Sequence, residues 1–211
     1  MMASKIGFAG RVGACVQRAR GPGLRWRLRN MLRLSYVRGW IGALLAGLFS
    51  KLTGVATVRA ELRARLRRAS GEWIDYGVLS RMVVTTAGVT LMATDFKDGT
   101  VDITNFKYHG CGTGTTAEAV GDTALVTEST TALNPDSTRA SGTNTTPSAN
   151  VYQSVGTLTF DAAAAITEHG VFSQAAVPGG TLWDRSVFSA INVAAGDSIQ
   201  FTYALTLTAG G

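Results

Sequence analysis

The chain has little of the chemistry on which most enzymes depend. Its 211 residues include only two histidines and two cysteines, and the cysteines, Cys15 and Cys111, lie far apart. No C-x-x-C pair, no H-E-x-x-H and no G-x-S-x-G sequence occurs, so the common zinc, metalloprotease and serine-hydrolase motifs are missing. Two free thiols are the simplest interpretation of the cysteines. We predict no enzyme activity, no cofactor and no metal site.

Long apolar stretches are missing as well. The longest runs from Trp40 to Phe49, well short of the roughly 20 apolar residues that span a bilayer. With the arginines before it, this run is similar to the core of a signal peptide, but the charged region ahead of it is too long. An Arg-rich, acid-free stretch up to residue 60 is also typical of an organelle transit peptide, and that alternative stays open. We predict no membrane partner.

Acidic residues are scarce in the first 81 positions, which hold three of them against sixteen lysines and arginines. Residues 82–211 reverse this balance, with four basic and eleven acidic residues. Such asymmetry is typical of a basic arm that meets a polyanion or an acidic protein surface. We therefore divide the chain into a basic, partly helical N-terminal arm, residues 1–72, and a second domain, residues 73–211.

Two stripes of apolar residues in the arm have the 3.6-residue period of amphipathic helices. The first comprises Leu24, Leu28, Met31 and Ser35, and the second comprises Val55, Val58, Leu62, Leu66 and Ala69. Arginines at intervals of four flank both stripes, and like charges at this spacing repel each other on a helix. These helices therefore need a partner. The predicted contact residues are Arg25, Arg29, Arg33, Arg59, Arg63 and Arg67.

From Trp73 onward, short runs rich in Val, Thr and Ala alternate with Gly, Pro and Asn turns. The clearest strand is the last, in which apolar residues alternate with polar ones from Ser198 to Leu207. Seven or eight short strands at this spacing predict an antiparallel β-sandwich or jelly roll. A polar stretch over residues 138–148 predicts a surface loop. The other strands are expected over residues 73–80, 83–94, 100–109, 123–130, 150–160, 165–173 and 181–192.

Two features of this domain invite a chemical interpretation. The glycine-rich stretch at 110–114 is superficially similar to a phosphate-binding loop, but it lacks the full G-x-G-x-x-G spacing and a following helix. His109 and Cys111 would share one face of a strand, yet two histidines in the whole chain are too few for a zinc site. We interpret the glycines as turn residues and the histidine as a structural side chain.

Several segments between residues 73 and 211 share a pattern with known proteins. They are VVTTAGV (83–89), NFKYHGCGTGTTAE (105–118), DTALVTE (122–128), TEHGVFSQ (167–174), LWDRSVFSAIN (182–192) and GDS (196–198). On these segments the β-domain resembles a family of small virion structural proteins of tailed bacteriophages, whereas the arm before Trp73 resembles it least. Such proteins are head decoration, fibre or connector components and are not catalytic, which implies the same for this chain.

The leading hypothesis is a capsid decoration or cement protein, located in the virion, whose basic arm binds the major capsid protein or other virion subunits. We expect a homo-oligomer and favour a trimer. One alternative is a fibre or adaptor of the tail or neck. A second alternative is a nucleic-acid-binding virion protein whose arm contacts packaged DNA.

Overall fold

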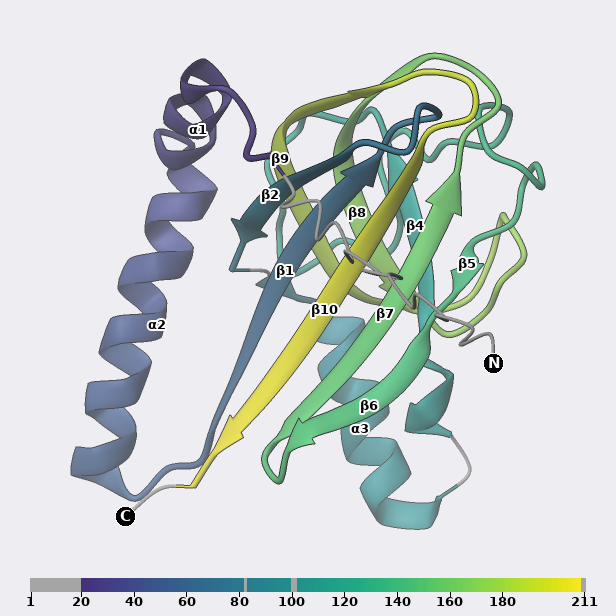
Figure 1. Cartoon of the computed structure of the whole chain (residues 1–211). Coiled ribbons are helices and arrows are strands. Elements are labelled where there is room, and N and C mark those ends of the chain that lie inside the picture. Colours follow the sequence, from purple (N-terminus) through teal and green to yellow (C-terminus); the bar gives the residue numbers. More distant parts are fainter. Residues whose placement is uncertain (1–19, 82, 100–101, 210–211) are drawn as a thin grey trace, which may run out of the picture.

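The computed structural model describes residues 20–81, 83–99 and 102–209 (Figure 1). Its strands are joined by short turns, by helix α3 and by one long loop that precedes β5. The elements in chain order are α1 (Leu24–Met31), α2 (Leu34–Thr53), β1 (Thr57–Arg67), β2 (Trp73–Ser80), β3 (Val83–Val84), α3 (Thr86–Asp98), a 3-10 turn (Ile103–Asn105), β4 (Tyr108–Gly112), β5 (Ala140–Ser141), β6 (Thr143–Ser148), β7 (Val151–Thr159), β8 (Ala164–Phe172), β9 (Leu182–Val193) and β10 (Ser198–Thr208).

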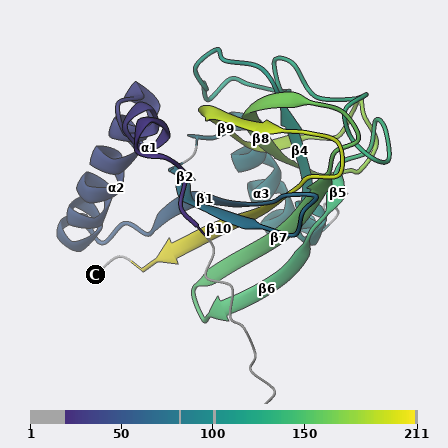
Figure 2. The same ribbon diagram turned by 45° about the horizontal axis from the view of Figure 1, so that its top comes forward.

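The strands form two five-stranded antiparallel sheets, with the order β2-β1-β10-β7-β6 in the first and β3-β9-β8-β4-β5 in the second. The sheets face each other as two layers (Figure 2). Ile199, Phe201 and Tyr203 of β10 are fully buried between them, while the intervening side chains lie on the outer surface. The prediction of a mainly-β fold of antiparallel sheets after a helical N-terminal region is confirmed.

The second helix expected in the arm is wrong, because residues 57–67 form strand β1 between β2 and β10. A spacing of four, as in Leu62 and Leu66, fits both a helical turn and the two-residue period of a strand. From Arg59 to Arg67, however, charged and apolar residues alternate without a break, and burial follows the same alternation. The first sheet therefore begins at β1, and the boundary expected at residues 72 and 73 lies within it.

The strand expected over residues 83–94 is also wrong beyond β3, because helix α3 follows. The Thr85 hydroxyl accepts a hydrogen bond from the Gly88 amide at 3.0 Å and caps the helix N-terminus. Gly99, in the left-handed conformation with φ 62°, ends the helix. A Cβ at Gly88 would lie 2.8 Å from the Trp183 carbonyl oxygen. Caps at both ends and this close approach to β9 favour the helix.

The remaining differences concern three segments. Of the strand expected over residues 100–109, residues 100–101 lie outside the described residues, and residues 102–109 form the 3-10 turn and the first two residues of β4. Residues 123–130 form no strand in the described structure beyond a single bridge to β4. The surface loop expected over residues 138–148 is wrong, because β5 and β6 form there as edge strands. Threonine-rich segments favour strands, and an edge tolerates their polarity. The strands predicted over 73–80, 150–160, 165–173 and 181–192 and at the C-terminal end are confirmed as β2, β7, β8, β9 and β10.

Helix α1, predicted from the first apolar stripe, closes one side of the two-sheet body. Trp26 donates from its indole Nε1 to the Ser189 carbonyl at 3.1 Å. The Asn30 side chain donates to the Leu79 carbonyl of β2 at 2.8 Å and accepts from the Ser189 amide of β9 at 3.1 Å. Because a free strand edge exposes unpaired backbone groups, these bonds protect the edges of both sheets at once.

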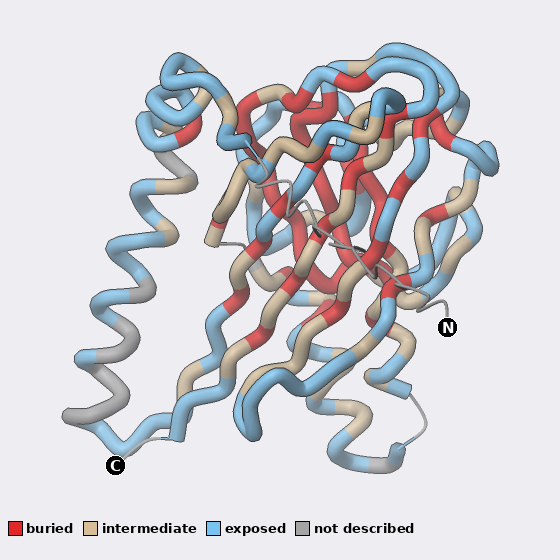
Figure 3. The backbone as a smooth tube through the Cα atoms, viewed as in Figure 1, coloured by how far each residue is buried: buried red, intermediate tan, exposed pale blue. Residues whose placement is uncertain are grey.

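Helix α2 lies beside the body, where it packs against α1, β1 and β2. Figure 3 shows the buried residues concentrated between the sheets, whereas α2 is largely exposed wherever its burial is described. At Gly39 a Cβ would lie 2.5 Å from the Arg81 carbonyl oxygen, so this glycine permits the approach of α2 to the end of β2. No helix in the described part of the chain is long and apolar enough to cross a bilayer.

Candidate functional site

His109 and Cys111 lie inside the fold, fully buried on β4. The His109 Nδ1 atom is 3.0 Å from His169 Nε2, and its Nε2 atom is 3.0 Å from the Ser154 hydroxyl. Burial lowers the pKa of His109 to about 3 and raises the pKa of the Cys111 thiol. A neutral imidazole and a protonated thiol are poor catalysts without access to solvent. Among the described residues, no group of three His, Cys, Asp or Glu side chains could hold a metal ion.

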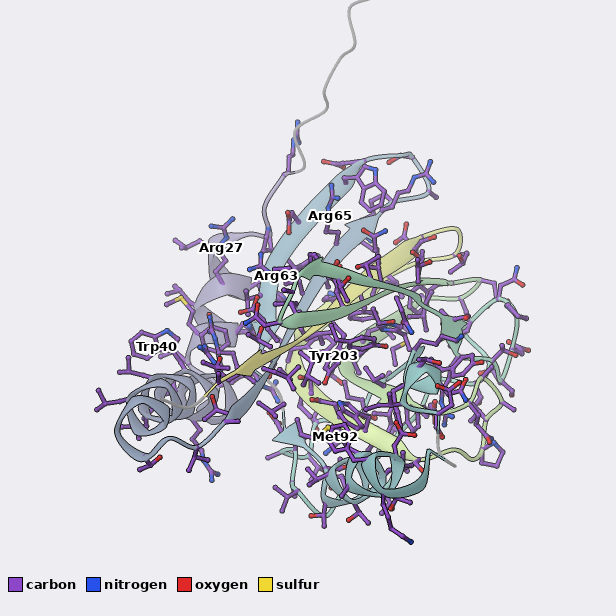
Figure 4. The ribbon with its side chains drawn as sticks, turned by 90° about the horizontal axis from the view of Figure 1, so that it is seen from below. Arg27, Trp40, Arg63, Arg65, Met92 and Tyr203 are labelled. Carbon is purple, nitrogen blue, oxygen red and sulfur yellow. The ribbon has the colours of Figure 1, made fainter. Side chains whose placement is uncertain are left out.

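The polar interior continues across the space between the sheets. Figure 4 labels Tyr203 there, and its hydroxyl accepts a 2.6 Å hydrogen bond from the Trp183 indole. The Asp184 carboxyl is fully buried, so desolvation, with the nearby charge of Glu118, raises its pKa well above the usual value. Burial and the neighbouring His109 lower the pKa of His169 well below its usual value. Burial thus favours the neutral forms of His109, His169 and Asp184.

Mild acid should destabilise this fold. His109 and His169 stay neutral in the folded chain but bind protons near pH 6.5 in the unfolded chain. Well below pH 6.5, each histidine therefore lowers the free energy of unfolding by about 1.4 kcal/mol per pH unit. Asp184 has the opposite effect above about pH 4, since the folded chain keeps its proton. We expect the free energy of urea unfolding to fall by about 1 kcal/mol between pH 6.5 and 5, because the opposing contribution of Asp184 offsets most of the histidine effect. In Asp184→Asn the fall should be about 3 kcal/mol. A flat profile in both proteins would contradict neutral buried imidazoles.

The glycine-rich 110–114 stretch surrounds a carboxylate of the protein itself. Glu168, fully buried on β8, accepts hydrogen bonds from the backbone amides of Gly114, Val126 and Thr127 at 3.1, 3.1 and 2.7 Å. The buried Arg185 guanidinium adds two more, at 3.1 and 2.9 Å. A Cβ at Gly114 would lie 2.5 Å from the carboxylate oxygen, so only glycine fits. Gly114 is thus the residue of the glycine-rich stretch that donates to this carboxylate, and its amide serves an internal ion pair.

The predicted contact arginines of α1 are brought together. Arg25, Arg29 and Arg33 line a groove of about 370 Å³ beside the exposed edge of β9, with Trp26 between them. Arg33 also donates to the Phe188 carbonyl at 3.0 Å. These cations therefore form one basic surface on a helix that is itself fixed to both sheets.

The other three predicted arginines belong to a different surface. Arg59, Arg63 and Arg67 lie on the outer face of the first sheet, along β1, and not on a helix. The helical interpretation missed Arg65, which the strand alternation places between them; Figure 4 labels Arg63 and Arg65. We call Arg59, Arg63, Arg65 and Arg67 the arginine column.

Helix α2 carries a feature that the sequence interpretation also missed. Six large apolar side chains on it are between 40 and 64% exposed, and they recur at helical spacing. Figure 4 labels one of them, Trp40, at the left edge of the molecule. The helical spacing of most of these residues is visible in the apolar run from Trp40 to Phe49, and this spacing could have predicted the exposed face. We call this set the α2 face: Val37, Trp40, Ile41, Leu44, Leu45 and Leu48.

Comparisons with known proteins assign no family. No protein-family model, no curated protein and no solved structure matches the chain. The resemblance to structural proteins of tailed phages therefore stays a prediction. The candidate functional surfaces are the α2 face, the α1 groove and the arginine column.

Proposed function

We propose that the chain is a non-enzymatic structural protein of a tailed-phage virion, a capsid decoration or cement protein that attaches through its helical N-terminal region. The observation that carries this proposal is the α2 face. Contiguous apolar patches of this kind on a folded protein mark sites where another macromolecule binds. Trp40 is the kind of residue that anchors such interfaces, and four leucine or isoleucine side chains add apolar area around it.

The setting of α2 supports an assembly role. Helix α1 is tied to β2 and β9 through buried Asn30, so the helix that follows it starts from a fixed base. Arg25 and Arg29 are exposed on α1 and would complement an acidic surface on a partner. The proposed partners are the major capsid protein or other virion subunits, together with further copies of this chain in a homo-oligomer, for which a trimer is favoured.

Charge on the α2 face should abolish assembly without unfolding the body. We expect Leu44→Glu with Leu48→Glu to weaken self-association at least 100-fold, because each removes an apolar contact of about 2 kcal/mol or more at an interface centre. The free energy of unfolding should change by less than about 0.5 kcal/mol, since both side chains are exposed. Sedimentation velocity measures the first quantity, and urea unfolding measures the second.

A matched control comes from α3, where Val89 and Phe96 are also exposed. Val89→Glu with Phe96→Glu adds the same charge on a different helix and should leave assembly intact. Equal loss in both variants would contradict a specific role for the α2 face. In purified particles, a count of hundreds of copies supports head decoration, and a few dozen or fewer would place the protein in the tail or neck.

A further inference from the structure

The outer face of the first sheet has a marked separation of charge. The arginine column lies on one face of β1, where alternate residues are about 6.8 Å apart and Glu61 separates Arg59 from Arg63. On the β2 side Asp75 lies opposite Arg65, whereas β10 and β7 on the other side present uncharged side chains, most of them able to form hydrogen bonds. Those of β10 are Gln200, Thr202, Ala204 and Thr206, and those of β7 are Gln153, Val155, Thr157 and Thr159.

Three of the four guanidinium groups in the column are not neutralised. Glu61, the acid on β1, is 2.8 Å from Arg63 and 3.3 Å from Arg81. Within the described ranges, no carboxylate lies at ion-pair distance from the remaining members of the column, Arg59, Arg65 and Arg67. These three cations are therefore available to an external anion.

An aromatic side chain completes the surface. Trp73 lies opposite Arg67 in the β1–β2 register, and its ring centre is 4.8 Å from the Arg65 guanidinium and 6.0 Å from that of Arg67. Indole rings and guanidinium planes are the platforms on which unpaired bases stack. A line of cations beside such a platform is the arrangement by which proteins hold single-stranded nucleic acid.

We propose that this face binds single-stranded nucleic acid, with Arg65 and Arg67 on neighbouring phosphates, Arg59 on a phosphate about 20 Å farther along the strand, and a base stacked at Trp73. A single strand fits better than a duplex, because the face is a flat sheet with no helix or ribbon to enter a groove, and paired bases cannot reach Trp73. An acidic protein fits less well because the columns of β10 and β7 offer hydroxyl and amide groups rather than apolar pockets. This binding goes beyond the proposed assembly role and does not depend on the α2 face.

The test is fluorescence anisotropy of the full chain with a labelled thymidylate oligomer, over about 50 to 200 mM salt. We expect binding whose logarithm falls linearly with the logarithm of salt concentration. In Arg59→Gln/Arg65→Gln/Arg67→Gln the slope should decrease by about 2, and affinity near 0.1 M salt should fall about 100-fold, since each single-strand phosphate contact contributes about 0.7. Trp73→Leu should weaken binding by roughly 5- to 100-fold with the slope unchanged.

Three controls make the result decisive. Arg25→Gln/Arg27→Gln/Arg29→Gln removes the same charge from exposed positions of α1 and should leave the slope unchanged. The Leu44→Glu/Leu48→Glu variant should still bind, which separates this proposal from the assembly role. Urea unfolding checks that each variant is folded. The proposal is overturned if the oligomer does not bind, if both arginine triples lose equal affinity, if duplex of the same sequence binds more tightly, or if polyglutamate competes as well as unlabelled oligomer.

Discussion

A chain that lacks residues 1–70 should fail to fold, whereas a chain that lacks residues 1–54 should keep both sheets. The difference between them is strand β1, which pairs with β10 over its whole length and with β2 on its other side. Leu62 and Leu66 of β1 are fully buried, and each contributes about 1.5 to 3 kcal/mol. Together with the lost backbone pairing, the loss of these two buried side chains amounts to much of the 5 to 15 kcal/mol by which domains are typically stable.

Soluble yield and urea unfolding followed by circular dichroism measure this result. The shorter deletion also removes Trp26 and Asn30, which protect the edges of β2 and β9, so we expect a folded but less stable protein that aggregates more readily. Cooperative unfolding of the chain that starts at residue 71 would contradict an essential β1. That result would instead support a β-domain that begins near Trp73, as the sequence predicts.

Glu168→Ala should lower the free energy of unfolding by about 3 to 5 kcal/mol. The substitution removes the carboxylate that accepts hydrogen bonds from two nitrogens of the fully buried Arg185. It also leaves the amides of Gly114 and Thr127 without their acceptor. Removing one partner of a buried ion pair has this large effect because the remaining charge stays desolvated. Asp122, 2.8 Å from Arg185 and partly exposed, compensates only in part.

The matched control is Glu61→Ala, which breaks the ion pairs with Arg63 and Arg81 near the surface. It should change the free energy of unfolding by less than about 1 kcal/mol, since exposed pairs contribute little. The double variant Glu168→Leu/Arg185→Met should lose less stability than Glu168→Leu and Arg185→Met together, because no uncompensated charge remains. Urea unfolding at pH 7 measures these variants and the unsubstituted chain. Equal effects of Glu168→Ala and Glu61→Ala would show that the buried pair has no special role.

The apolar and polar alternation of β10 was sufficient to predict a strand with one buried face, because both faces of a strand follow directly from the sequence. The same alternation was present in β1 but was hidden by leucines spaced four apart, which also fit a helix. Arg65 was the deciding residue. A helix would place it away from Arg59, Arg63 and Arg67, whereas the strand adds it to the same column.

For α3, the capping residues Thr85 and Gly99 were visible in the sequence, but valine and threonine content favoured a strand. The contact between Gly88 and Trp183, nearly a hundred residues away, is one that no local pattern contains. The position of His109 is similar: its partners His169 and Ser154 come from two other strands, one in each sheet.

The sequence by itself determined the mainly-β class, the β7 to β10 strands, the helix at Leu24–Met31 and the concentration of positive charge before residue 82. These follow from local periodicity and composition, which short-range backbone geometry translates directly into structure. Only the tertiary structure decided that β1 lies inside the first sheet, that Glu168 occupies the 110–114 loop, and that α2 exposes an apolar face. Each of these depends on which distant residues pack together, because the same side chain can be buried or exposed according to its neighbours.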